Sequence, residues 1–557
     1  MEYYSKILDM NVLKNYIFND PIVDWFKIQN IKSNIFVKDK NNDFKQYITK
    51  ETILYKQDFF KKIKNKINSL HPNNIIYDNL GIKENIHLIK NEYPIILNPL
   101  LIHEKFNLYV KVDILIKARL FKEIFKEIKN IDINNINNNE YLIINIVPET
   151  LNFKSDLKSL QQNEIILFNE CSLYTFNSCL KKIIPRSDIG FIFGKAYKFK
   201  KTLLNKRENI GLVKFNDNIR LKILNAIDWI KRLKENNYRI PDGIPDTLEL
   251  YPNMNIKDSD YQDEKKKIAT QIKEITLVWR ISFTERNELI KNGITTYDNI
   301  YLINNLYDMK DSNTKNIQEK IIHMNIQEEI LITPRKTLST NFTNILIPHN
   351  NEYVLDIENL LHLEEKFNYF NDIITEDKAQ ICIIGSVHIQ DNIYKSFQDY
   401  TINNIFLEEE KKIVINWLKS LKSSNNKYIY IYHWGSAENT YINYLKNKYP
   451  DIIWPRIILI DLLHFFRSEP IILKGLFNFG LKDIGKILYK NKFITTTWQD
   501  TDNGLDAMIK FKQICENKKN NIPLKRYNEI TEIINYNKND CLVLTEILMF
   551  LRKKYLS

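Results

Sequence analysis

The chain has 557 residues, of which 44% are hydrophobic and 12% aromatic; this is enough for two or three cored domains and excludes a long disordered protein. The net charge of +12 arises from 80 basic and 68 acidic residues, so it describes mainly a mixed, solvated surface and only weakly favours a polyanionic partner. The five cysteines are odd in number and lack Cys-x-x-Cys spacing, which argues against a zinc knuckle, an iron–sulfur cluster and a secreted disulfide framework.

The N-terminal residues carry charge from Glu2 onward and contain no continuous apolar core, which argues against a signal peptide. The longest apolar stretch, residues 452–466, is interrupted by Pro455, Arg456 and Asp461 and is too short and too charged to span a bilayer. We therefore expect a soluble intracellular protein that is not secreted and has no membrane partner.

Residues 1–210 alternate β-type runs with Lys/Asn-rich loops. Their patterns predict strands over residues 108–116 and 140–147, and helices over residues 59–67, 121–128 and 158–169. This layout, with Asp113 inside the first strand, resembles the RecB-like nuclease module of the PD-(D/E)XK superfamily. In that family an acidic residue on the first core helix, a strand aspartate and an acidic-x-Lys motif bind metal, and Asp113 matches the strand aspartate.

The remaining motif positions of this module depart from the family pattern. Asn145-Ile146-Val147 stands where the acidic-x-Lys motif would fall, and Phe59-Phe60 stands where the helix usually carries Phe-Glu. Asn145 and Val147 supply neither a second anionic ligand nor the lysine, so the usual magnesium site cannot be assembled. The resemblance therefore implies a degenerate module over residues 1–210, retained as a scaffold or as a nucleic-acid surface.

A helical pattern follows over residues 211–340, which we interpret as a connector. Residues 283–298 predict a helix, a stop at Gly293 and a capping box from Thr295 to Asp298 that starts another helix. This segment is similar to the helix-hairpin-helix element that links RecB-like modules to a C-terminal exonuclease domain. The glycine-bearing hairpin that offers amides to phosphate is absent before Thr284, so the pattern favours packing over DNA contact.

The third region starts with residues 353–360, an apolar β-type run that contains Asp356 and Glu358. Side chains two residues apart on a strand point to the same face. Two adjacent carboxylates on a mostly buried strand repel each other unless a cation or a proton is shared between them. This pattern indicates a divalent-metal site; the alternative is that Asp356 caps the end of an edge strand and that Glu358 is solvated.

Further acidic residues follow at the ends of the predicted elements. Glu438 falls in the first turn of a helix, where the helix dipole alone favours an anion by about 0.3–1 kcal/mol. Asp461 ends the strand predicted over residues 457–462. Tyr536 and Asp540 lie four residues apart and therefore on one face of an amphipathic C-terminal helix.

Carboxylates on an early strand, at a helix start and on a late helix with Tyr-x-x-x before the aspartate resemble the DEDD exonucleases of the tyrosine subtype. Asp356 and Glu358 match the first motif of that family, Glu438 stands where most members have Asp, and Asp540 with Tyr536 matches the last motif. The resemblance covers residues 345–557 and implies an RNase H-like domain there. The expected fold is thus α/β: a mixed-sheet exonuclease domain preceded by the PD-(D/E)XK-like module and the helical connector.

The resemblance also implies a cofactor and a role for each residue. Two Mg²⁺ or Mn²⁺ ions about 3.5–4 Å apart activate a water and neutralise the attacking and departing oxygens of a phosphodiester. Such hard cations prefer oxygen ligands. Asp356 would bridge both ions, Glu358 and Asp540 would each hold one, and Glu438 would reach the second directly or through water. Tyr536 would orient the nucleophilic water.

Weaker candidates complete the expected site. Asp461 and Asp113 are secondary candidates for metal ligands, and Lys482 and Trp434 are candidates for nucleic-acid binding, although a tryptophan such as Trp434 also suits a core. Trp498 also matches the sequence pattern of these exonucleases, but no chemical role is assigned to it. The expected function is a metal-dependent 3′–5′ exonuclease acting on DNA or RNA. The alternative is a non-catalytic nucleic-acid-binding or scaffold protein in which both nuclease domains have decayed.

Overall fold

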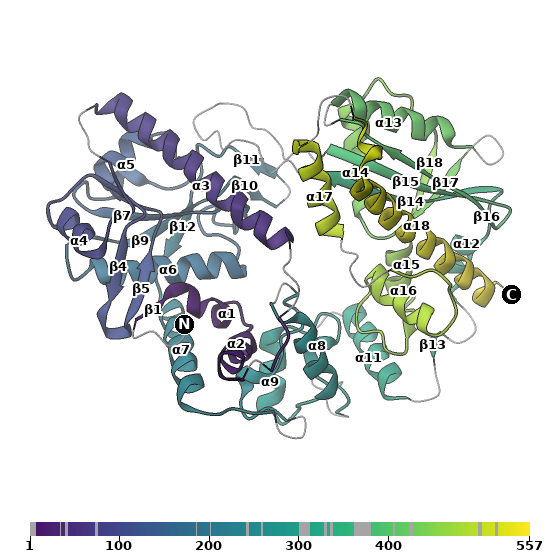
Figure 1. Cartoon of the computed structure of the whole chain (residues 1–557), viewed down its shortest axis with the longest axis horizontal. Coiled ribbons are helices and arrows are strands. Elements are labelled where there is room, and N and C mark those ends of the chain that lie inside the picture. The colour runs from purple at the N-terminus through teal and green to yellow at the C-terminus, as the bar shows by residue number, and fades with distance from the viewer. Residues whose placement is uncertain are drawn as a thin grey trace. The chain divides into compact units, whose positions relative to one another are not determined.

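The computed structural model divides into two compact units, apart from short stretches: an N-terminal unit that runs to Ile272 and a C-terminal unit that starts at Lys273 (Figure 1). Both units combine helices with mixed sheets, which confirms the α/β class. None of the helices in the described part of the chain has the length and apolar character that a bilayer crossing requires. The structure describes residues 7–33, 35–38, 43–72, 76–184, 186–200, 202–240, 244–257, 260–299, 312–327, 331–334, 338–360, 380–404, 407–422, 428–498, 504–517 and 522–556.

The N-terminal unit is built on a six-stranded sheet of order β12-β9-β7-β6-β3-β2. Its described strands are β1 (Leu8–Asp9), β2 (Tyr77–Asp78), β3 (Ile95–Leu97), β4 (Leu100–His103), β5 (Leu108–Lys111), β6 (Ile114–Lys117), β7 (Tyr141–Ile146), β8 (Thr150–Asn152), β9 (Arg186–Phe193), β10 (Ala196–Phe199), β11 (Thr202–Leu204) and β12 (Gly211–Lys214). Its described helices are α1 (Lys14–Ile17), α2 (Ile22–Ser33), α3 (Asp43–Leu70), α4 (Ile82–Lys90), α5 (Ala118–Ile124), α6 (Glu164–Leu180), α7 (Asp217–Glu235) and α8 (Gln262–Gln271).

Alternate side chains of this sheet fill separate hydrophobic cores on its two faces. Ile114 of β6 packs in the same core as Phe59 of α3 and Phe121 of α5. The next residue, Leu115, lies in the core that contains Phe176 of α6. The period-2 alternation of a strand therefore distributes helices over both faces of the sheet.

Several boundaries predicted for this unit are wrong. The helix predicted over residues 121–128 is α5, which runs from Ala118 to Ile124. The run over residues 108–116 forms two strands, because β5 pairs with β4 in one sheet whereas β6 pairs with β3 and β7 in another. Helix α6 begins at Glu164 and not at Lys158, because the Asn163 side chain accepts a hydrogen bond from Ile166 N at 2.8 Å and caps the helix there. Just before it, Leu160 forms a β-bridge with Phe153.

The region predicted as a connector does not form a unit of its own. Helices α7 and α8 belong to the N-terminal unit, and α9 (Phe283–Lys291) belongs to the C-terminal unit. The capping box lies at Ser282 and Glu285, where each side chain bonds the backbone N–H of the other residue. Asp298 instead accepts a hydrogen bond from Thr296 Oγ1 at 2.7 Å, and the helix predicted to follow lies outside the described residues.

The C-terminal unit is built on a five-stranded mixed sheet of order β16-β15-β14-β17-β18. The pairs β16/β15 and β15/β14 are antiparallel, whereas β14/β17 and β17/β18 are parallel. Besides α9, its described elements are α11 (Ser312–Ile326), β13 (Ile332–Thr333), α12 (Thr340–Leu346), β14 (Asn351–Leu360), β15 (Gln380–Gln390), β16 (Ile393–Thr401), α13 (Leu407–Ser420), β17 (Ile429–His433), α14 (Ala437–Lys448), β18 (Ile457–Asp461), α15 (Leu462–Ser468), β19 (Ile472–Leu473), α16 (Leu481–Lys490), α17 (Gly504–Asn517) and α18 (Asn528–Tyr555).

The central strand β14 divides its side chains between the two faces of this sheet. Tyr353, Leu355 and Ile357 pack in one core, which also contains Trp417 of α13. Val354 packs in the other core, with residues of α15, α16 and α18. Helix α18 crosses β14 and β15 on this second face (Figure 1). Up to the irregularity in strand pairing after Glu358, the even-numbered residues of β14 therefore point toward α18.

A buried ion pair fixes the position of α18 on β14. Arg552 donates to both carboxylate oxygens of Glu352, with distances of 2.9 Å from Nη1 and 2.6 Å from Nη2. The Tyr432 hydroxyl donates to Glu352 at 3.0 Å, and Arg552 Nε donates to Leu346 O at 2.8 Å. Because the pair is bidentate and fully buried, shifting the helix along the strand would leave charges uncompensated in the core.

Candidate metal centre

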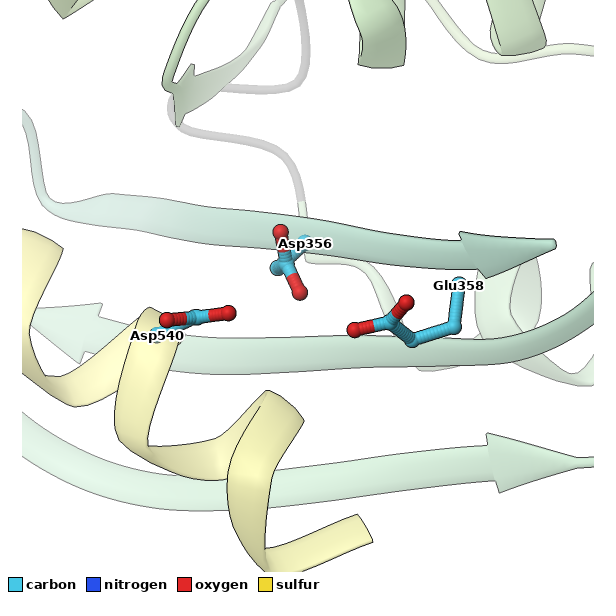
Figure 2. Close-up of side chains that lie close together, drawn as sticks. All are labelled: Asp356, Glu358 and Asp540. Carbon is cyan, nitrogen blue, oxygen red and sulfur yellow. The ribbon is translucent and has the colours of Figure 1, made fainter. Parts of the chain in front are cut away.

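Three carboxylates from two elements meet on the face of the sheet covered by α18. Asp356 and Glu358 extend from β14 and Asp540 extends from α18, and Figure 2 shows the three side chains pointing toward one another. Each offers an oxygen atom, and these atoms all lie within 4.8 Å of one another. Asp540 is buried and the other two are half-buried, and this is the one such group among the described residues.

The close approach of α18 to the sheet depends on a glycine. Gly385 of β15 is the strand partner of Asp356, and a Cβ atom at Gly385 would overlap Asn537 Oδ1 on α18. Asn537 is fully buried and donates from Nδ2 to Asp356 Oδ2 at 2.6 Å and to Asp356 O at 3.3 Å. This amide therefore fixes the orientation of Asp356, and the absent side chain at residue 385 leaves room for it.

Burial and then mutual repulsion within this group raise the pKa of two of its carboxylates. The pKa of Asp356 lies well above its ordinary value, first because of burial and then because of Asp540, Glu358 and Glu438; the hydrogen bond from Asn537 opposes the shift. Burial and then Asp540 raise the pKa of Glu358 to about 8. Bound protons therefore lower the negative charge of this group near neutral pH, and a divalent cation would take the place of these protons.

Asp540 has its own hydrogen-bond donor. Trp498 Nε1 donates to Asp540 Oδ1 at 2.6 Å, and the indole is 5% exposed. The ring of Trp498 packs against Gly485 of α16, where a Cβ would lie 2.8 Å from it. A rigid aromatic donor thus orients one oxygen of Asp540.

Glu438 lies in the first turn of α14, as predicted, and is 5% exposed. It is outside the group of three carboxylates, although it is near enough to raise the pKa of both Asp356 and Glu358. His433 Nδ1 lies 3.5 Å from Glu438 Oε2, and neither atom has a hydrogen-bond partner among the described residues. A buried carboxylate oxygen without a donor is suited to bind a cation.

Tyr536 and Lys482 lie beside the carboxylates. Burial and then Asp540 and Glu358 raise the pKa of the Tyr536 phenol, so it keeps its proton at neutral pH. Lys482 Nζ lies 4.7 Å from the centre of the Tyr536 ring, and its charge lowers the pKa of Glu358. The site therefore combines an anionic group with one neutral hydroxyl donor and one cation.

Two further candidates, Asp461 and Trp434, have structural contacts. Asp461 Oδ1 accepts hydrogen bonds from Gly435 N at 2.8 Å and from Leu463 N at 2.9 Å, so it caps α15 and anchors the loop after β17. It lies outside the group of three carboxylates. Trp434 is half-buried and packs against Phe466 with ring centroids 5.4 Å apart.

Asp113 of the N-terminal unit is neutralised within the chain. Lys56 Nζ of α3 lies 2.8 Å from each of its oxygens, and Ile146 N donates to Oδ2 at 2.6 Å. Asn145 contributes its side-chain oxygen, which accepts from Asp113 N at 3.2 Å. A lysine ammonium therefore occupies the position beside this carboxylate that a metal ion would take, and no group of three potential ligands forms around Asp113 in the described chain.

The sequence analysis missed Asn537 and the contact of Trp498 with Asp540. Asn537 follows Tyr536 and precedes Asp540 by three residues, so its helical spacing was a signal that it shares a face with Asp540. The contact of Trp498 joins residues 42 positions apart, and local pattern carries no such information.

The sequence matches no family model and no curated protein. Its function is therefore inferred from the residues and their geometry.

Proposed function

We propose that the C-terminal unit is a metal-dependent 3′–5′ exonuclease that hydrolyses phosphodiester bonds of DNA or RNA. The observation that carries this proposal is the group formed by Asp356, Glu358 and Asp540, whose oxygens lie within 4.8 Å of one another. An all-oxygen donor set suits Mg²⁺ or Mn²⁺. The mixed sheet, in which three antiparallel strands are extended by two parallel ones, supports the RNase H-like fold that the sequence resemblance implies.

The residues present fit a pair of divalent cations. Asp356 would hold both ions, Glu358 and Asp540 one each, and Glu438 the second, directly or through water. When bound, the ions lower the pKa of a water and neutralise charge on the attacking and departing oxygens. The raised pKa of Glu358, about 8, supports this fit, because carboxylates that repel one another gain most from a shared cation.

The other residues of the site position the ligands and the substrate. Asn537 holds Asp356 and Trp498 holds Asp540, each through a hydrogen bond of 2.6 Å, so two ligands are oriented before any substrate binds. The protonated phenol of Tyr536 can donate to the attacking water and orient it. Lys482, beside Tyr536, provides a positive charge that can bind a phosphate oxygen of the substrate.

The proposal is tested with single strands of DNA and RNA labelled at either end, incubated with the full chain and Mn²⁺. We expect stepwise release of mononucleotides from the 3′ end by the wild type and no release by Asp356→Ala. The matched control is Asp113→Ala, which we expect to retain activity.

Two results would refute the proposal. Activity that survives Asp356→Ala and is lost in Asp113→Ala would place the chemistry in the N-terminal unit. Binding without turnover, weakening steeply with salt, would identify a non-catalytic nucleic-acid-binding protein.

A further inference from the structure

The C-terminal unit also contains a cavity of about 620 Å³, which we call the α18 cavity. It is lined by the last turns of α18 and by the segment that follows α16, together with Ile332. Phe493 and Phe550 form part of its wall, with ring centroids 4.9 Å apart, and Phe493 is 39% exposed. The volume is within the range of small-molecule sites, about 300–1,000 Å³, and the exposed ring of Phe493 offers a stacking surface for a planar group.

The charge of this lining favours an anion. Lys492, Lys553 and Lys554 line the cavity, and Glu546 is its single acidic lining residue. Glu546 accepts hydrogen bonds from the backbone N–H and the hydroxyl groups of Thr495 and Thr496, which lower its pKa against the opposing effect of burial. Its oxygens are therefore already engaged by the protein, and three lysines outweigh it.

One segment of chain connects the lining of the cavity to the carboxylates. Residues 493–498 follow α18 in the reverse direction: Phe493 contacts Phe550, Thr495 contacts Glu546, and Trp498 contacts Asp540. Phe550 follows Asp540 by ten residues on the helix, which corresponds to about 15 Å. That length is roughly four stacked nucleotides.

We infer that the α18 cavity binds a nucleotide of the single-stranded substrate, about four nucleotides upstream of the scissile bond. The base stacks on Phe493, and the neighbouring phosphates face Lys492 and Lys553. An aromatic surface beside lysines is the combination that binds single strands without reading their sequence. This inference rests on the proposed function, because it assigns the cavity to the same substrate.

The test measures binding and turnover separately, with the full chain. Binding is measured by fluorescence anisotropy in an Asp356→Asn background, which prevents hydrolysis, with labelled ten-residue oligothymidylate and oligouridylate. Turnover is measured in the wild-type background on a dinucleotide, which is too short to reach the cavity. The cavity variants are Phe493→Ala and Lys553→Gln, and the matched controls are Tyr394→Ala and Lys419→Gln, which remove an exposed aromatic and an exposed lysine elsewhere in the unit.

We expect Phe493→Ala to weaken binding of the ten-residue strands at least about fivefold. Lys553→Gln should lower the salt dependence of binding by about one charge. Dinucleotide turnover and both controls should remain unchanged. A larger effect on oligouridylate than on oligothymidylate, or the reverse, would also support the cavity.

Equal affinity of the cavity variants and the controls for the ten-residue strands would overturn the inference, as would an equal loss of dinucleotide turnover. Failure of the proposed function is distinguishable from either result. In that case the wild type would show no Mn²⁺-dependent hydrolysis, whereas binding of the longer strands would still depend on Phe493 and support the cavity.

Discussion

Two isosteric substitutions, Asp356→Asn and Asp113→Asn, should change the stability of this protein in opposite directions when divalent cations are removed. Asp356 lies among like charges, so replacing it by a neutral amide removes repulsion and keeps an acceptor for Asn537. Asp113 lies against Lys56, so the same replacement removes an ion pair and leaves the lysine charge uncompensated.

The size of each change in unfolding free energy can be estimated from the distances between the charges. Two unit charges 4.8 Å apart repel by about 3.5 kcal/mol at an effective dielectric constant of 20. Asp356 is half-buried, and solvent screening lowers the gain on its replacement to about 1–3 kcal/mol. Asp113→Asn should cost about 1–3 kcal/mol, less than the usual cost of breaking a buried pair, because the Lys56 side chain is 31% exposed.

The stabilisation caused by Asp356→Asn should change with pH in a definite direction. The pKa of Glu358 is raised to about 8 in the folded protein, so the protonated carboxyl group stabilises the fold. This contribution is fully present below the ordinary pKa near 4.5. That stability is lost as the pH rises through about 8. The gain from Asp356→Asn should therefore be small at pH 4.5 and largest near pH 8.

The assay is thermal unfolding of both variants and the wild type in EDTA and in Mn²⁺, between pH 4.5 and pH 8. A change of 1 kcal/mol shifts Tm by about 2–4 °C in a unit of this size. Mn²⁺ should raise the Tm of the wild type and of Asp113→Asn, but not that of Asp356→Asn. Loss of stability in EDTA for both variants, or an equal effect of Mn²⁺ on all three proteins, would refute the electrostatic reasoning.

Three further predictions test how the site is held. Gly385→Ala should destabilise the protein by about 1–3 kcal/mol in urea unfolding, because the new Cβ meets Asn537; an unchanged midpoint would show that α18 does not approach the sheet this closely. Arg552→Met should cost about 3–5 kcal/mol, and adding Glu352→Gln should recover part of the loss; additive losses in the double variant would contradict the buried pair. Trp498→Phe should lower Mn²⁺ affinity, measured by calorimetry, about 10- to 100-fold with little change in Tm; wild-type affinity would exclude a positioning role for the indole.

Local periodicity was sufficient to predict the parts of the candidate site that lie on one element. The two-residue spacing of Asp356 and Glu358 indicates one face of a strand, and the four-residue spacing of Tyr536 and Asp540 indicates one face of a helix. The start of α14 likewise followed from the pattern around Glu438. These features depend on backbone geometry that a short stretch of sequence determines.

Contacts between distant segments could not be predicted in this way. The bonds from Asn537 to Asp356 and from Trp498 to Asp540 depend on where α18 lies on the sheet. The division of residues 108–116 into two strands was missed because β-type apolar residues continue through both halves, so the pattern does not show where the pairing partner changes. Residues 211–340 were assigned to a separate connector because the apolar pattern of a helix does not indicate which hydrophobic core the helix packs against.

Helix α18 carries Asp540, Glu546 and Arg552 on one continuous rod of 28 residues. Each added or deleted residue in an α-helix rotates everything beyond it by about 100° and moves it by about 1.5 Å. An insertion between Asp540 and Arg552 would therefore turn either the carboxylate or the guanidinium away from the sheet. Length changes in this gene should consequently be tolerated in loops and selected against between Asp540 and Arg552, even where the inserted residue is an alanine.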